Sequence, residues 1–100
     1  MPYEIQVHES ASNEIESLRV FDQRLIMDAI EKHLSHQAVV PTRRRKRLDA
    51  LIPQFEHVPP IWELRVGSFR VLYDVDEASR VVHVRAVRRK GPGQTTKDIT

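Results

Sequence analysis

Two arginines placed to face each other are the side chains in this chain best suited to bind an anion. The stretch 62–76 predicts two strands, because apolar side chains recur at every second residue on both sides of Gly67–Ser68. Gly67–Ser68 fits a two-residue hairpin turn with glycine in the first central position, which sets Arg65 directly opposite Arg70. Like charges in that arrangement repel, and planar guanidinium groups match the oxygens of a phosphate. The hairpin therefore predicts a phosphate-binding site.

Further polar side chains are expected on the same face of the sheet. Glu63 shares this face by alternation, and a strand from Val81 adds others if it continues the sheet as a simple antiparallel meander. Those additions are His83, Arg85 and Arg89, with Arg88 and Lys90 near the exit of the strand. Glu63 and His83 are the candidates for proton transfer. The alternative is an ordinary solvated network, in which Arg65 pairs with Asp74 or Glu63.

A second source of positive charge precedes the hairpin. Its members are consecutive: Arg43, Arg44, Arg45, Lys46 and Arg47. Most basic runs are solvated or flexible segments, but this one would flank the arginine face, so a nucleic-acid backbone could lie across both. Residues 1–36 carry seven acidic and three basic side chains, whereas residues 37–100 carry seven acidic and 13 basic ones. This asymmetry favours a polyanionic partner for the basic part.

The elements that must position these groups predict an α+β fold. Residues 3–7 alternate as a short N-terminal strand, and Ser10 and Asp22 are the expected N-caps of two antiparallel helices. A proline-rich loop then leads to a three-stranded antiparallel meander. We expect one domain over residues 1–100, with a mobile tail at 91–100.

The composition excludes several classes of protein. The 100 residues include no cysteine, which excludes disulfides and thiolate metal sites and favours a reducing cytoplasm. No apolar run is long enough to span a membrane, and the N-terminus lacks the pattern of a secretory signal, so we expect no membrane partner. The histidines show no spacing typical of metal ligands, and there is no glycine-rich phosphate loop or nucleophile elbow. No metal or cofactor is therefore predicted.

Taken in order, these elements and motifs resemble the RelE/ParE superfamily of bacterial type II toxins. The likeness covers about residues 3–90 and implies the RelE-like fold. The motifs that carry it are R-R-K-R-L at 44–48, W-E-L-R at 62–65, F-R-V-L-Y at 69–73 and V-R-A-V-R-R-K at 84–90.

The resemblance implies a toxin with one of two targets. RelE-like members cut mRNA in the A site of the ribosome, whereas ParE-like members bind DNA gyrase without catalysis of their own. Both are neutralised by a cognate antitoxin, which usually wraps an amphipathic segment over the toxin. We expect a cytoplasmic, metal-independent endoribonuclease that acts on mRNA at the ribosome. The alternatives are a gyrase inhibitor and a degenerate module that only binds its antitoxin.

The resemblance also implies roles for particular residues. By position, Arg70 matches the arginine that grips the scissile phosphate, Arg65 and Lys46 or Arg47 match basic positions around it, and Arg89 or Lys90 matches a catalytic position near the last strand. RelE-like ribonucleases commonly place a tyrosine or histidine after that strand, where this chain has G-P-G-Q-T-T at 91–96, so the general base is not identified. Together, the predicted catalytic residues are Arg65, Arg70, Lys90, Glu63 and His83, and the predicted RNA contacts are Arg43, Arg44, Arg45, Lys46, Arg47, Arg85, Arg88 and Arg89.

Overall fold

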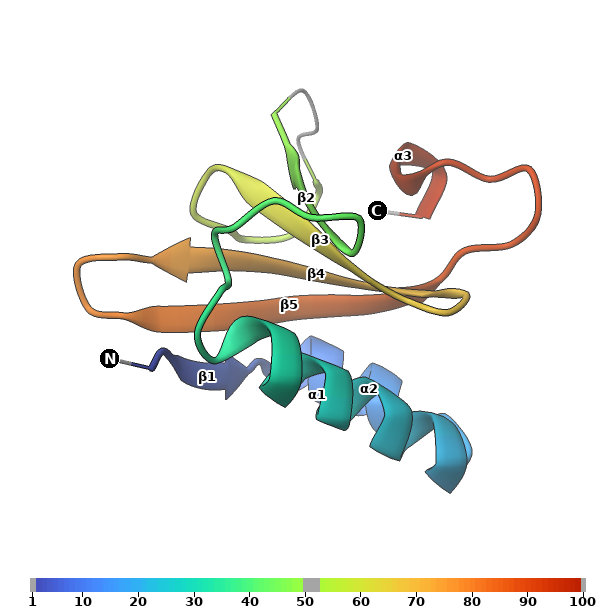
Figure 1. The fold of residues 1–100 in the computed structure, drawn as a ribbon. Helices are drawn as coiled ribbons and strands as arrows, with labels where there is room; N and C mark the ends of the chain where they lie inside the picture. Colours follow the sequence, from blue (N-terminus) through green and yellow to red (C-terminus); the bar gives the residue numbers. More distant parts are fainter. Residues whose placement is uncertain (1, 50–52, 100) are drawn as a thin grey trace.

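The computed structural model describes residues 2–49 and 53–99, which form a five-stranded sheet and three helices. In chain order the elements are β1 (Glu4–Val7), α1 (Glu9–Glu16), α2 (Val20–Leu34), β2 (Arg45–Leu48), β3 (Ile61–Val66), β4 (Phe69–Asp76), β5 (Val81–Arg89) and α3 (Thr96–Ile99). The strands lie in the order β1-β5-β4-β3-β2, with β1 parallel to β5 and the other pairs antiparallel (Figure 1). The predicted α+β class and the meander β3-β4-β5 are confirmed. The sheet gains β2, part of the basic run, as an additional edge strand.

The predicted hairpin is confirmed residue by residue. Arg65 pairs with Arg70, Leu64 with Val71, and Val66 with Phe69. Gly67 has a φ of +58°, a backbone conformation that costs a side-chain-bearing residue energy and that glycine adopts freely. The turn therefore fixes the register that sets the two arginines opposite each other.

The predicted alternation of side chains along β5 is correct only for the first half of the strand. Asp74 pairs with His83, but Tyr73 pairs with Val84 and Leu72 with Ala86, so a β-bulge inserts one extra residue, Arg85. An inserted residue exchanges the two faces for everything that follows it. The second half of β5 is therefore turned over relative to a simple meander.

The bulge changes which arginine of β5 lies on the polar face. Val87 joins the core, although alternation assigned it to the open face. Arg88 pairs with Arg70 on that face. Arg89, predicted to lie there, instead packs its guanidinium carbon over the Phe69 ring at 4.6 Å from the ring centroid.

Both helices begin before the predicted caps. His8 is the N-cap of α1, and Arg19 is the N-cap of α2, so Ser10 and Asp22 lie inside the first turns. Asp22 accepts a hydrogen bond from Arg19 Nε at 2.9 Å. A carboxylate in the first turn is also stabilised by the free backbone N–H groups there, so Asp22 favours the helix without capping it.

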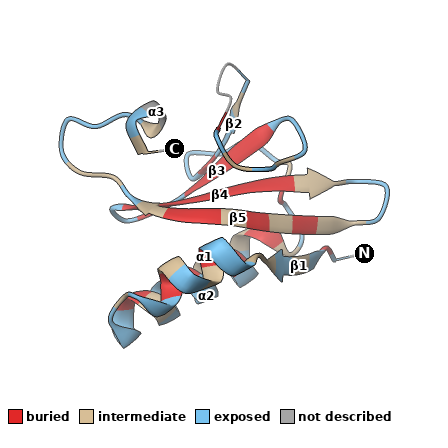
Figure 2. Cartoon of the chain, turned by 180° about the vertical axis from the view of Figure 1, so that it is seen from behind, coloured by how far each residue is buried: buried red, intermediate tan, exposed pale blue. Residues whose placement is uncertain are grey.

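The two faces of the sheet differ in what covers them. Helices α1 and α2 pack on one face (Figure 1), where apolar side chains of the sheet and of both helices form the main core. The opposite face carries a small apolar cluster of Ile61, Leu72 and Ala86, with Leu48 and Phe55 against it. Buried residues dominate the central strands (Figure 2). None of the helices in the described part of the chain is long and apolar enough to cross a membrane.

Candidate nucleic-acid interface

Polar side chains of four strands come together at the hairpin end of the face opposite α1 and α2. Cross-strand pairing sets Lys46 beside Glu63, Arg65 beside Arg70, and Arg70 beside Arg88. We call these five residues the basic cluster. The basic cluster contains four cations and one carboxylate, so its net charge is positive and suited to a phosphate.

Arg70 is the centre of the basic cluster and is largely buried, with 8% of the residue exposed. Its Nη1 donates hydrogen bonds of 2.8 Å to the carbonyl oxygens of Gly67 and Phe69. Its Nε lies 3.5 Å from Glu63 Oε1, an ion-pair distance, yet that buried nitrogen makes no hydrogen bond. A buried guanidinium N–H without a hydrogen bond is costly, so this donor would gain from an added oxygen ligand.

Arg88 and Arg65 flank Arg70 and differ in exposure. Arg65 is exposed, so its guanidinium is accessible to an anion from solution. Arg88 is half-buried and pairs with Glu14 of α1, while the other Glu14 oxygen accepts the Val87 N–H at 3.1 Å. Glu14 therefore satisfies the edge of β5 where β1 has ended and also holds Arg88 in place.

The basic run separates into one structural residue and four exposed ones. Arg45 is only 3% exposed, and its guanidinium donates to Val40 O at 2.9 Å, Gln37 Oε1 at 3.1 Å and His33 O at 3.3 Å. These bonds attach β2 to the end of α2 and to the segment that follows it, so Arg45 stabilises the fold. The exposed members are Arg43, Arg44, Lys46 and Arg47.

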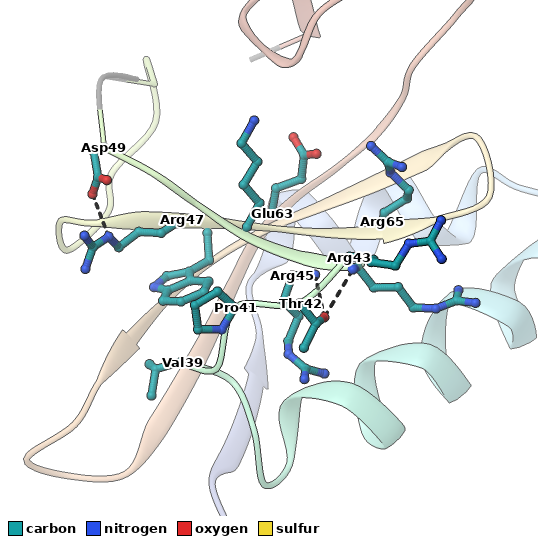
Figure 3. A pocket seen from close by; sticks show the side chains of 12 residues that line it. Val39, Pro41, Thr42, Arg43, Arg45, Arg47, Asp49, Glu63 and Arg65 are labelled. Carbon is teal, nitrogen blue, oxygen red and sulfur yellow. Dashed lines mark hydrogen bonds and ion pairs between the residues drawn. The ribbon is translucent and has the colours of Figure 1, made fainter.

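A pocket of about 520 Å³ runs along β2. Val39, Pro41 and Trp62 supply its apolar wall, and the basic run supplies much of its polar wall. Figure 3 shows Glu63 and Arg65 projecting to one side of the strands and Arg45 to the other. The pocket thus adjoins the basic cluster through Glu63 and Arg65, and a polyanion could follow both.

The two remaining polar residues of β5 lie in a separate group. His83 Nδ1 is 2.8 Å from Nε2 of His8, and Arg85 Nε donates to Asp74 Oδ2 at 2.7 Å. We call these four residues the histidine cluster. Asp74 pairs with His83 whereas Arg70 pairs with Arg88 four residues away on β4, which is roughly 13 Å along a strand.

The structure therefore does not bring His83 and Arg85 to the arginine pair. Asp74 is fully buried and the Arg85 side chain is 12% exposed, so each has its partner within the fold. Lys90, the last predicted catalytic residue, follows β5 and is half-buried, with its backbone N–H bonded to Ser68 O at 2.7 Å. Of the predicted proton-transfer residues, only Glu63 adjoins Arg70.

Acidification is expected to destabilise the fold through the histidine cluster. Burial, followed by the charges of Arg85 and His83, lowers the pKa of His8 below its usual 6.5, although Asp74 and Glu56 act in the opposite sense. The folded protein therefore binds a proton at His8 less readily than the unfolded chain does. The contribution of neutral His8 to the free energy of unfolding is complete above pH 6.5 and is lost as the pH falls below it. Urea unfolding at pH 7.5 and 5.5 measures the difference.

The variant His8→Gln should show a weaker dependence on pH than the wild type. Part of the dependence should remain, because burial and the nearby Arg45 charge also lower the pKa of His33. A wild-type protein with the same urea midpoint at both pH values would contradict this expectation.

Known structures share this arrangement of a sheet with two helices packed on one face. A chain of the RelE–RelB complex from the archaeon Pyrococcus horikoshii OT3 matches with a TM-score of 0.69 and 18% identity, over 93% of this chain and 100% of that one. A chain of the Mycobacterium tuberculosis RelBE2 toxin–antitoxin complex matches with a TM-score of 0.64 and 17% identity, over 90% and 100%. A double arginine-to-alanine mutant of free Escherichia coli RelE gives 0.58 and 17%, over 94% and 88%. The fold is thus that of RelE-type toxins.

The family follows from the sequence itself. The family model described as the ParE toxin of the type II toxin–antitoxin system parDE matches residues 5–91. The chain therefore belongs to this toxin family, within the RelE/ParE superfamily. No curated protein matches the sequence.

Proposed function

We propose that this toxin is an endoribonuclease that cuts mRNA at the ribosome, with the scissile phosphate bound at the basic cluster. The observation that carries the proposal is Arg70, whose buried Nε lacks a hydrogen bond while Arg65 and Arg88 stand on either side. A pre-positioned guanidinium of this kind stabilises the negative charge that develops on a phosphorane, which is where electrostatic catalysis has its largest effect.

Glu63 is the residue of the basic cluster able to accept a proton. In the proposed reaction its carboxylate takes the proton of the 2′-hydroxyl, and the 2′-oxygen then attacks the adjacent phosphorus. The bond from phosphorus to the 5′-oxygen breaks, that oxygen takes up a proton from water, and the product strand ends in a 2′,3′-cyclic phosphate. Arg70 and Arg65 stabilise the doubly charged phosphorane, and proton removal by a positioned base adds roughly 10²–10⁴-fold.

Mapping mRNA ends in cells tests the proposal. Induction of the toxin should arrest growth and produce new mRNA ends within translated regions. The control for the replacement of Arg70 by alanine is Arg24→Ala. This variant removes an exposed arginine of α2 far in sequence from the basic cluster, so it should behave as wild type. Growth arrest without new mRNA ends would reject the endonuclease.

Inhibition of DNA gyrase is the second candidate. The pairing of Glu63 with Arg70, and the location of His83 in the histidine cluster, leave the basic cluster with few groups for proton transfer. A toxin that only binds its target needs no such group. A supercoiling assay with pure protein separates the two candidates, since the endonuclease should leave gyrase active.

An antitoxin partner is proposed for the exposed apolar side chains of α2. Two of the similar structures, RelE–RelB from Pyrococcus horikoshii and RelBE2 from Mycobacterium tuberculosis, are toxin–antitoxin complexes. Large apolar side chains remain exposed along the first half of α2: Val20, Phe21, Leu25 and Met27. An amphipathic antitoxin segment would cover them. Failure of the protein encoded next to the toxin to co-purify with it would contradict this.

We also propose a cytoplasmic location, because ribosomes and gyrase are found there.

A further inference from the structure

The C-terminal turn α3 contacts the basic cluster through two hydrogen bonds. The hydroxyl of Thr96 donates to Oε2 of Glu63, and Arg88 Nε donates to the backbone carbonyl of Ile99 at 3.0 Å. The two partners on the sheet, the acceptor Glu63 and the donor Arg88, both belong to the basic cluster. In Figure 1, α3 lies beside the end of the sheet that carries β2 and β3. The chain therefore places its own C-terminal segment on the candidate phosphate site.

The groups that α3 presents are those that RNA would present. The Thr96 hydroxyl occupies the position on Glu63 that a ribose 2′-hydroxyl would take in the proposed reaction. The Ile99 carbonyl supplies Arg88 with an oxygen where a phosphate would supply a charged one. A guanidinium binds a phosphate oxygen more strongly than a neutral carbonyl, so RNA could replace this contact. The segment thus occupies the site in the manner of a weak substrate.

The helical turn α3 is short, and its backbone is weakly constrained on the side of β5. Its four residues are too few to form a stable helix alone. The segment that connects it to β5 contains Gly91, Pro92 and Gly93, and the positive φ of Gly93, +77°, suits glycine. Meanwhile Arg70 Nε remains buried and without a hydrogen bond, so α3 does not satisfy the most demanding donor of the site. A contact set of this kind can open at modest cost.

We propose that α3 is a displaceable cover that occupies the basic cluster in the free toxin and must leave before a phosphodiester binds there. The inference rests on the proposed function of the basic cluster as a phosphate site. It adds that the free chain is partly self-inhibited. The measured association constant for phosphate is then the intrinsic constant multiplied by the fraction of molecules in which the cover is open.

The test compares Thr96→Val, which removes the hydroxyl and keeps the shape, with Thr95→Val in the full-length chain. Thr95 is exposed and offers a matched change one residue away. Inorganic phosphate is titrated at constant ionic strength while the Nε–H signals of Arg70 and Arg88 are followed by NMR. Loss of one hydrogen bond to a carboxylate should tighten apparent phosphate binding roughly tenfold in Thr96→Val. Thr95→Val should stay within about twofold of wild type.

Amide hydrogen exchange of residues 94–99 is the second measurement. Measured in phosphate-free buffer, Thr96→Val should increase exchange in this segment, whereas Thr95→Val should not. Equal phosphate affinity in both variants would overturn the cover while leaving the phosphate site intact. Weaker binding in Thr96→Val would also overturn it, because α3 would then be part of the site. Phosphate that perturbs neither arginine in any variant would reject the proposed phosphate site, and the cover with it.

Discussion

Replacing Arg70 by alanine is expected to lower mRNA cleavage about a hundredfold to a thousandfold. Arg70 is the cation that the hairpin register places between Arg65 and Arg88, and its Nε is the donor left without a hydrogen bond. Removing one pre-positioned donor to a developing oxyanion typically costs 10²–10³ in kcat. Single-turnover cleavage of an mRNA in ribosome complexes measures the effect.

A loss of folding must be separated from a loss of chemistry, because Arg70 also supports its own turn through Gly67 O and Phe69 O. Arg70→Lys keeps a positive charge but lacks the planar fork, so it should lose most of the activity while keeping most of the stability. Arg65→Ala, at an exposed position, should lose less activity and no stability. Full cleavage by a folded Arg70→Lys protein would remove Arg70 from the proposed role.

Replacing Asp74 by alanine is expected to lower the free energy of unfolding by about 3–5 kcal/mol. Asp74 is fully buried, and its loss leaves the guanidinium of Arg85, itself 12% exposed, without a counter-charge. Removing one partner of a buried ion pair costs this much because the remaining charge is not compensated. Urea unfolding monitored by Trp62 fluorescence measures the change.

An exposed ion pair supplies the control. Arg47 and Asp49 are 55% and 67% exposed, so Asp49→Ala should cost at most about 1 kcal/mol. The double variant Asp74→Leu/Arg85→Met should recover most of the stability that Asp74→Ala loses, because apolar groups can replace a buried ion pair. A loss below about 1 kcal/mol in Asp74→Ala would show that Arg85 finds solvent, and would return it to the candidates for RNA contact.

Local rules were sufficient to predict the hairpin from the sequence. Gly67 and Ser68 determine the turn, the turn determines the register, and the register determines that Arg65 faces Arg70. The bulge at Arg85 was not predicted, because an extra residue in a strand is selected by packing and pairing elsewhere in the fold. A signal was nonetheless present, since Ala86 and Val87 are adjacent apolar residues that break the alternation of the strand.

The candidate site was predictable in charge but only partly in membership. Nothing local distinguishes Arg45 from its basic neighbours, and its burial depends on acceptors that α2 and the following loop bring from elsewhere in the chain. The position of Arg88 beside Arg70 depends on the bulge. The contact of Thr96 with Glu63 joins residues 33 positions apart, which no periodicity reveals.

A purified translation reaction with one defined mRNA tests the central claim most directly. The wild-type toxin should cut that mRNA only when ribosomes are present, leave a 2′,3′-cyclic phosphate at the new end, and lose this activity in Arg70→Lys. An intact mRNA in the presence of a folded wild-type toxin, together with loss of gyrase supercoiling in a parallel reaction, would contradict it.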